Sequence, residues 1–260
     1  MRALLLAAAL LAGALPAHTR AQTSKADPFD SGQWPVLAAE HFKGQAVVFD
    51  RRVAVTAPGF AEDPMNVPVL VDASALPDVE RVVVLVDRNP IRKVLEYLPT
   101  GAKPVLSFRF KLEQSSPVRA AARTRDGVWH VGGAWVESTG GGCTVPGASR
   151  ANATWPQTLG QVSGRVFERD ASDAGAGSSR LRVKIMHPMD TGLVSGIPAF
   201  YIDELRLTDE AGTEYMKILT WEPVSENPVF SFDLGRRPHG ALLLVGRDNN
   251  GNRIRARIAQ

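Results

Sequence analysis

Hydrophobic and polar residues alternate along most of the chain, a pattern that predicts β-strands with one buried and one solvent-exposed face. The clearest alternation lies in residues 106–112, 180–185 and 253–258, where most polar positions are Arg or Lys. In the first of these segments the pattern places Lys111 on the exposed face, opposite the Leu and Phe side chains. The sequence therefore predicts half-buried strands rather than amphipathic helices.

Further segments fit the same all-β interpretation. Residues 82–86 and 241–245 are continuous apolar runs, as expected of strands inside a sandwich. The Asn-Asn-Gly-Asn sequence at 249–252 predicts a hairpin turn, because Asn and Gly tolerate positive φ. Helical spacing is convincing only at residues 33–42. Turn signals recur about every ten residues, the spacing typical of β-sandwiches.

Composition indicates two β domains. The 260 residues include 23 Gly and 18 Pro, and residues 138–159 and 171–179 are rich in small residues. A chain of this length divides more naturally into two domains of roughly 100–150 residues than into one. We expect the first domain at residues 27–143, a linker at 144–161 and the second domain at 162–260. The stretch 171–179 is interpreted as a long loop inside the second domain.

The first 21 residues have the pattern of a secretory signal peptide. A basic n-region at Met1–Arg2 precedes a run without polar side chains at 3–15, and Thr-Arg-Ala at 19–21 is a plausible cleavage box. The run is shorter than the ~20 residues that a membrane-spanning helix needs, although an uncleaved anchor is the alternative. Cleavage would leave 28 basic and 27 acidic residues, since 30 Lys and Arg include Arg2 and Arg20. We therefore expect an exported, soluble protein that binds neither nucleic acid nor membrane.

Cys143 is the single cysteine, which is unusual in an exported protein because oxidising compartments favour paired cysteines. Gly140, Gly141 and Gly142 precede it, and glycines leave the sulfur unshielded and the backbone free to move. We expect an exposed thiol on a flexible arm, in preference to a small buried core residue. Five extended residues reach roughly 13–14 Å, which suits a group carrier better than a rigidly held catalytic nucleophile.

Two sets of motifs carry a resemblance to a known family. Trp-Val-Glu at residues 135–137, followed by Gly-Gly-Gly-Cys at 140–143, resembles SoxY, the sulfur-oxidation subunit with a glycine-rich cysteine arm. His-Pro-Met-Asp-Thr-Gly at 187–192, Trp-Glu-Pro-Val-Ser-Glu-Asn-Pro at 221–228 and Asp-Asn-Asn-Gly at 248–251 resemble its partner SoxZ. The combined order is similar to the fused SoxYZ-like carriers associated with quinoprotein dehydrogenases.

The resemblance implies two immunoglobulin-like sandwiches in tandem. It also implies a periplasmic carrier, rather than an enzyme, that holds a sulfur-containing intermediate covalently on Cys143 and presents it to partner redox enzymes. Those partners would include a c-type cytochrome and a quinoprotein dehydrogenase, and no metal or cofactor is implied. In SoxY the cysteine lies at the very C-terminus, whereas here Thr144 follows and the chain continues. The arm is therefore tethered on both sides, and its cargo can differ from thiosulfate-derived sulfur.

A thiol with an ordinary pKa near 8.5 is only a few per cent ionised at neutral pH. No cationic residue follows Cys143 until Arg150, so we expect no built-in activation. The chain contains no Cys-x-x-Cys-His haem motif, so an oxidising partner would have to supply the driving force. In the absence of a partner, Cys143 could bridge two copies in a disulfide-linked homodimer.

Three other interpretations stay open. Met186, His187 and Met189 could bind copper, although the thioethers could equally fill a core while His187 caps a turn. A thiol hydrolase would need a histidine beside Cys143, and His130 lies on the preceding predicted strand. A two-domain adaptor without chemistry would be unaffected by replacing Cys143 with Ser.

Overall fold

The computed structural model describes residues 23–24, 26–151, 154–168, 178–235, 238 and 240–259. The predicted signal peptide and almost all of the predicted loop at 171–179 lie outside the described residues. Among the described residues, no helix combines the length and the apolar character that crossing a membrane requires.

The first half of the chain is built from strands and one helix. The strands are β1 (Thr23–Ser24), β2 (Val47–Asp50), β3 (Ala54–Thr56), β4 (Val67–Asp72), β5 (Val79–Val86), β6 (Lys93–Leu98), β7 (Ala102–Phe110), β8 (Ser116–Thr124) and β9 (Trp129–Val136). The helix α1 (Trp34–Phe42) falls where the sequence predicts one, with Pro35 in its first turn. It ends at Lys43, whose backbone is left-handed.

The second half is also mostly strands. A short 3-10 turn (Ala148–Ala151) and α2 (Trp155–Thr158) precede them. The strands are β10 (Val162–Glu168), β11 (Ser179–Ile185), β12 (Ile202–Asp209), β13 (Glu214–Thr220), β14 (Val229–Leu234), β15 (Leu242–Asp248) and β16 (Arg253–Ile258). The predicted hairpin joins β15 to β16, with Asp248 accepting the backbone N–H groups of Asn250 and Asn252. The all-β prediction of two immunoglobulin-like units in tandem is confirmed.

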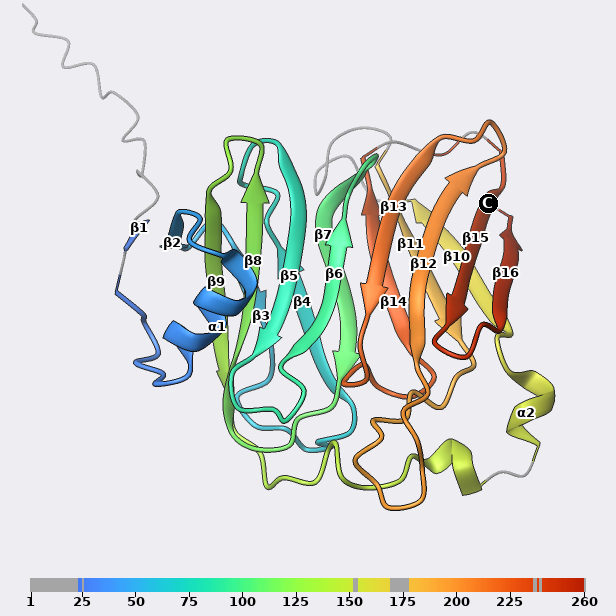
Figure 1. Cartoon of the computed structure of the whole chain (residues 1–260). Helices are drawn as coiled ribbons and strands as arrows, with labels where there is room; N and C mark the ends of the chain where they lie inside the picture. The colour runs from blue at the N-terminus through green and yellow to red at the C-terminus, as the bar shows by residue number, and fades with distance from the viewer. Residues whose placement is uncertain are drawn as a thin grey trace, which may run out of the picture.

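The strands form two layers that both run through the whole molecule. The order is β1-β2-β9-β8-β5-β6-β13-β12-β15-β16 in the larger sheet and β10-β11-β14-β7-β4-β3 in the smaller one. Figure 1 shows the ten-stranded sheet in front of the six-stranded sheet. The two halves meet edge to edge, because β6 pairs with β13 and β7 pairs with β14. Pairing of this kind leaves no open sheet edge between the units.

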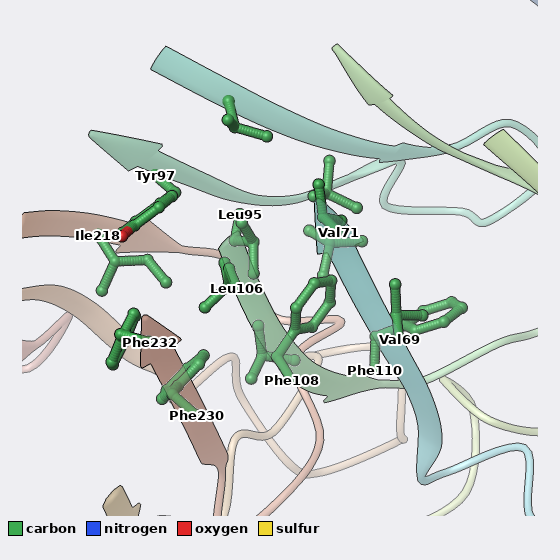
Figure 2. Packing of buried hydrophobic residues seen from close by; sticks show 14 of the residues in the cluster. Val69, Val71, Leu95, Tyr97, Leu106, Phe108, Phe110, Ile218, Phe230 and Phe232 are labelled. Atoms are coloured by element: carbon green, nitrogen blue, oxygen red, sulfur yellow. The ribbon is translucent and has the colours of Figure 1, made fainter. Parts of the chain in front are cut away.

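One hydrophobic core fills the space between the layers and continues across the junction of the two halves. Tyr97 of β6 stacks on Phe232 of β14 with ring centroids 5.8 Å apart, so side chains of both halves interdigitate. Figure 2 shows Leu106 and Phe108 beside Phe230 and Phe232 in this region. The halves therefore share a single core, whereas the sequence analysis treats them as domains that a linker joins.

A second, smaller core lies between α1 and the outer face of the ten-stranded sheet. Arg119 of β8 is fully buried near it, and its guanidinium donates to both Asp27 and Asp87 at 2.8–3.0 Å. The same group lies 4.5 Å from the Trp34 ring centroid. A buried charge is tolerated only when it is paired, and here two carboxylates satisfy one guanidinium.

Candidate functional site

The cysteine arm, defined here as residues 139–144, follows β9 and crosses one end of the sandwich. Figure 1 shows this part of the chain running beneath both halves, toward the 3-10 turn and α2. Ser138 anchors the start of the arm by donating its N–H to the Ser115 hydroxyl at 2.9 Å. Gly140 and Gly141 then adopt φ values of +94° and +85°, which L side chains rarely adopt. These two glycines turn the chain back toward the protein.

Gly142 brings the arm into direct contact with other backbone. A Cβ atom added at Gly142 would lie 2.4 Å from the Pro64 carbonyl oxygen and 2.5 Å from that of Leu112. No side chain fits at such distances, so a glycine is required for this close approach. The glycine run therefore packs the arm against the first half of the molecule.

Cys143 is fully buried. Its N–H donates to the Glu113 carboxylate at 2.8 Å, and its carbonyl accepts the Thr191 hydroxyl at 2.6 Å. The sulfur lies 3.7 Å from the Lys111 carbonyl oxygen, and the next residue, Thr144, donates its hydroxyl to Glu113 at 2.9 Å. The expectation of an exposed thiol is wrong, because Cys143 is fully buried and the small glycines permit close packing as readily as exposure.

Burial, together with the neighbouring Glu113 carboxylate, raises the pKa of the Cys143 thiol to about 12, against the opposing effect of the Lys111 cation. We call the buried arrangement of the arm in this structure the closed position. In it the sulfur is a protonated thiol at neutral pH. Because the thiolate is the nucleophile, this geometry protects Cys143 rather than activating it.

Lys111 is the cation that the sequence analysis places on the exposed face of a strand, and the structure corrects this placement. Only 3% of its surface is exposed, and its ammonium donates to the Met189 carbonyl oxygen. Burial lowers the pKa of Lys111 to about 8, against the attraction of Cys143, Asp190, Glu226 and Glu222. No cation follows Cys143 until Arg150, but the fold brings Lys111 toward the sulfur from 32 residues upstream. The raised pKa of the thiol agrees with the expectation that nothing built into the chain activates it.

The alternating pattern could not reveal that Lys111 is buried. Lys111 directly follows β7, where its N–H donates to the Pro223 carbonyl at 2.6 Å. The second half thus covers a position that alternation alone assigns to solvent.

Two of the three SoxZ-like motifs supply much of the cover over the arm. Thr191 and Met189 come from residues 187–192, and Pro223 comes from residues 221–228. In the second motif Ser225 donates its hydroxyl to the Met65 carbonyl of the first half at 2.6 Å. These motifs, far from Cys143 in sequence, form one side of the site.

The chain beyond the arm is also held by the second half. Glu226 accepts both the N–H and the hydroxyl of Ser149, and Asp190 accepts the Arg150 guanidinium at 3.0 Å. Arg150 also lies over the Trp155 ring, 4.6 Å from its centroid. The segment predicted as a linker is thus packed along its described central part.

The copper interpretation finds no support in the geometry. His187 is fully buried, its Nδ1 accepts the Met189 N–H at 3.1 Å, and its Nε2 faces Asp248 at 3.5 Å. The Met189 sulfur accepts the Ile202 N–H at 3.3 Å. Burial lowers the pKa of His187 to about 4, so the ring is neutral at pH 7. Within the described ranges no cluster of three or more His, Cys, Asp or Glu side chains could hold a metal ion.

His130 does not approach Cys143. Its Nδ1 lies 2.8 Å from Asp50, on the strand that pairs with β9 near its start, whereas the arm begins after the other end of β9. The structure therefore does not place His130 in the role that a thiol hydrolase would require.

Two family models match the chain in tandem. The model "Sulfur oxidation protein SoxY" matches residues 38–143, and "Sulphur oxidation protein SoxZ" matches residues 169–259. Together with the fold, these matches define a two-unit β-sandwich protein of sulfur oxidation. The chain belongs to the SoxY and SoxZ families and is a fused SoxYZ-like protein. The first match ends at Cys143, the residue that follows the glycine run.

A solved structure of the sulfur carrier protein SoxY from Chlorobium limicola f thiosulfatophilum is 21% identical, with a TM-score of 0.37. It covers 41% of this chain and 96% of its own. No curated protein matches the sequence.

Proposed function

We propose that this protein carries a sulfur-containing intermediate bound covalently to Cys143. The observation that supports the proposal most directly is the position of the single cysteine. It ends the SoxY match after three glycines and lies beneath the SoxZ-like motifs. A carrier needs one reactive side chain at a place that can be opened, and we propose that the cysteine arm is that place.

Loading would be an oxidative coupling between Cys143 and a sulfur nucleophile RS⁻. The thiol and RS⁻ give the disulfide-type product Cys–S–S–R, one proton and two electrons. A partner redox enzyme, such as a c-type cytochrome, would accept the electrons, since this chain has no haem-binding motif. Unloading would be a thiol–disulfide exchange, in which a thiolate R′S⁻ of another partner enzyme attacks the cargo sulfur, R–S–S–R′ forms, and Cys143 leaves as its thiolate.

Loading requires the arm to leave its closed position. The thiol is fully buried, so the contacts of Cys143 with Glu113 and Thr191 have to break before a second sulfur can bond to it. Opening also exposes the thiol to water, where its pKa returns toward the ordinary value near 8.5. The cysteine arm would then have two positions: a closed one that protects the empty Cys143 thiol, and an open one in which the thiol can react.

Export and partner choice belong to the same proposal. The signal-peptide pattern at residues 1–21 supports a periplasmic location, where electron-accepting cytochromes and quinoprotein dehydrogenases could act as partners. An opened arm that meets no partner could instead form a Cys143-linked homodimer in this oxidising compartment.

Intact-mass spectrometry of the protein from its own periplasm tests the proposal. We expect a reductant-sensitive, sulfur-containing mass increment that maps to Cys143 and is absent from Cys143→Ser. A wild-type protein that carries the mass of the free thiol under sulfur-oxidising growth would contradict it.

The second candidate is an adaptor that carries no covalent cargo. The burial and the raised pKa of Cys143 favour it. An adaptor would support sulfur oxidation in cells equally well as wild type and as Cys143→Ser. A carrier would lose that activity with the thiol.

A further inference from the structure

The outer face of the six-stranded sheet presents a continuous row of side chains across both halves of the molecule. In the strand register, Thr56 lies opposite Leu70, Leu70 opposite Ser107, and Ser107 opposite Ser231. Ser231 then lies opposite Arg182, and Arg182 opposite Arg165. The row begins with small or uncharged side chains in the first half and ends with two arginines in the second.

Because the middle of this row is built from small side chains, the face is hollowed there. A groove of about 520 Å³ lies over β3, β4, β7, β14 and β11, and Ser107, Arg109, Arg182 and Ser231 are among its lining residues. A second groove, of about 330 Å³, continues over β10 and shares Arg182 with the first. The hollow therefore crosses the junction at which β7 pairs with β14.

The cations along this hollow are exposed and unpaired. We call Arg109, Arg165, Arg182 and Lys184, with the row between them, the basic face. Arg109, Arg182 and Lys184 have no ion pair within the part of the chain that the structure describes. Arg165 contacts the Phe167 ring and lies directly opposite Arg182. Like charges opposite each other destabilise a sheet, so stability does not account for this arrangement.

In the next row of the same face, by contrast, the arginine is paired with a carboxylate. There Arg180 donates to Asp233, and this pair neutralises the charges of both residues. Asp72 of the same face accepts hydrogen bonds from Ser74 and forms no ion pair among the residues that the structure describes, so one carboxylate remains there, but the four cations of the basic face outnumber it.

We propose that the basic face docks an acidic surface segment of the redox protein that loads or unloads Cys143. The inference rests on the proposed function for the identity of the partner. The cations of the basic face are spread over β7, β11 and β10, so one small anion cannot reach all of them. A second copy of this chain would bring the same positive charges, and like-charge contacts oppose association. A protein segment with several carboxylates matches both the spacing and the hydroxyl-rich floor of the groove.

The position of the basic face relative to the thiol fits this role. Arg109 lies two residues before Lys111, whose carbonyl contacts the Cys143 sulfur. The Arg109 carbonyl accepts the N–H of Ser225, which belongs to the motif that borders the arm. A partner bound to the basic face would therefore contact β7, and Lys111, which follows this strand, contacts the Cys143 sulfur through its carbonyl.

A peptide-binding experiment tests the surface independently of any cargo. The probe is a ten-residue peptide of alternating Glu and Ala, and its Lys-Ala counterpart is the negative probe. We expect the Glu peptide to shift the backbone amide signals of Ser107, Arg182 and Ser231, with affinity that falls as salt rises. Replacing Arg109, Arg182 and Lys184 together by Gln should weaken binding about tenfold. The matched control replaces three exposed cations elsewhere, Lys43, Arg253 and Arg255, and should change binding less than twofold.

Equal weakening in both triple variants, or shifts confined to another face, would overturn the proposal. Concentration-dependent dimerisation through the basic face, lost in the first triple variant, would also overturn it in favour of a second copy. Tight binding of inorganic sulfate at the same residues, with no peptide binding, would assign the face to a small anion instead.

A second measurement in cells separates this inference from the proposed function. The fraction of Cys143 that carries an adduct is compared among wild type and the two triple variants. A loss of about fivefold or more in the Arg109, Arg182 and Lys184 variant alone supports docking. Equal adduct levels in all three proteins contradict docking while leaving the carrier intact. No adduct in wild type contradicts the carrier, and the peptide experiment then still decides whether the face binds acidic segments.

Discussion

Replacing Glu113 by Gln should release the cysteine arm. The Glu113 carboxylate accepts two hydrogen bonds from the arm, from the Cys143 N–H at 2.8 Å and from the Thr144 hydroxyl at 2.9 Å. A Gln side chain offers one accepting oxygen, and its NH₂ group cannot accept from an N–H. The variant therefore loses the charged acceptor of both bonds and retains at most a neutral bond from the Cys143 N–H and a bond from its own NH₂ to the Thr144 hydroxyl, while Cys143 itself is fully buried.

The size of the effect follows from the opening equilibrium. A hydrogen bond to a charged group contributes about 1.5–3 kcal/mol, and each ~1.4 kcal/mol changes an equilibrium tenfold. When a reagent reacts only with the opened arm, the labelling rate is proportional to the opening constant. Glu113→Gln should thus label about 10- to 140-fold faster than wild type. Thr191→Val removes a neutral hydrogen bond from the other half, worth about 0.5–1.5 kcal/mol, and should accelerate labelling by roughly two- to tenfold.

The assay is reaction of the reduced protein with a chromogenic disulfide reagent without denaturant, followed over pH. The control is Glu62→Gln, which removes the same charge at an exposed position. Labelling through opening should follow the ordinary thiol pKa near 8.5, rather than the value of about 12 of the closed position. Unfolding midpoints in denaturant show whether a faster rate reflects local or global opening.

Two results would refute this reasoning. Equal labelling rates for Glu113→Gln and wild type, at equal global stability, would mean that the carboxylate does not hold the arm. Wild-type labelling as fast as that of a small-molecule thiol would mean that the closed position is not the main state in solution.

Two further predictions concern buried charges. The first compares the Cys143→Ser protein, which keeps Lys111, with the same protein carrying Lys111→Met. The difference between their free energies of unfolding should rise in favour of the protein with Lys111 between about pH 8 and 10.5. The folded protein releases the lysine proton near pH 8, while the unfolded chain holds it to about 10.5, so the unfolded state binds more protons in this window. Denaturant titrations at several pH values measure the difference, and a flat profile would contradict the burial of this ammonium. Arg119→Met should lose about 3–5 kcal/mol of stability, because it leaves the fully buried Asp87 without its cation. Arg123→Met on the same strand breaks an exposed pair with Glu80 and should cost at most about 1 kcal/mol, so similar losses in both variants would contradict the argument.

Local pattern alone was enough to predict the strands at 82–86, 106–112, 180–185, 241–245 and 253–258, the helix near 33–42 and the last hairpin. Alternation reports which side of a strand faces apolar neighbours, and this property depends on residues two positions apart. The motifs at 140–143, 187–192 and 221–228 likewise indicated the family before any contact was known. These features are local in sequence, so a sequence contains them directly.

The state of the thiol was decided by tertiary structure. Glycines at 140–142 are compatible with a free arm and with a tightly packed one, because a residue without a side chain imposes neither. The outcome depends on Glu113, Thr191 and the backbone at Pro64 and Leu112, which the fold brings to Cys143 from distant positions. Lys111 shows the same limit: alternation places it toward solvent, and the edge-to-edge pairing of the halves covers it. Burial at a junction depends on the two surfaces that meet there. The sequence pattern of one strand describes its own surface and says nothing about the surface that covers it.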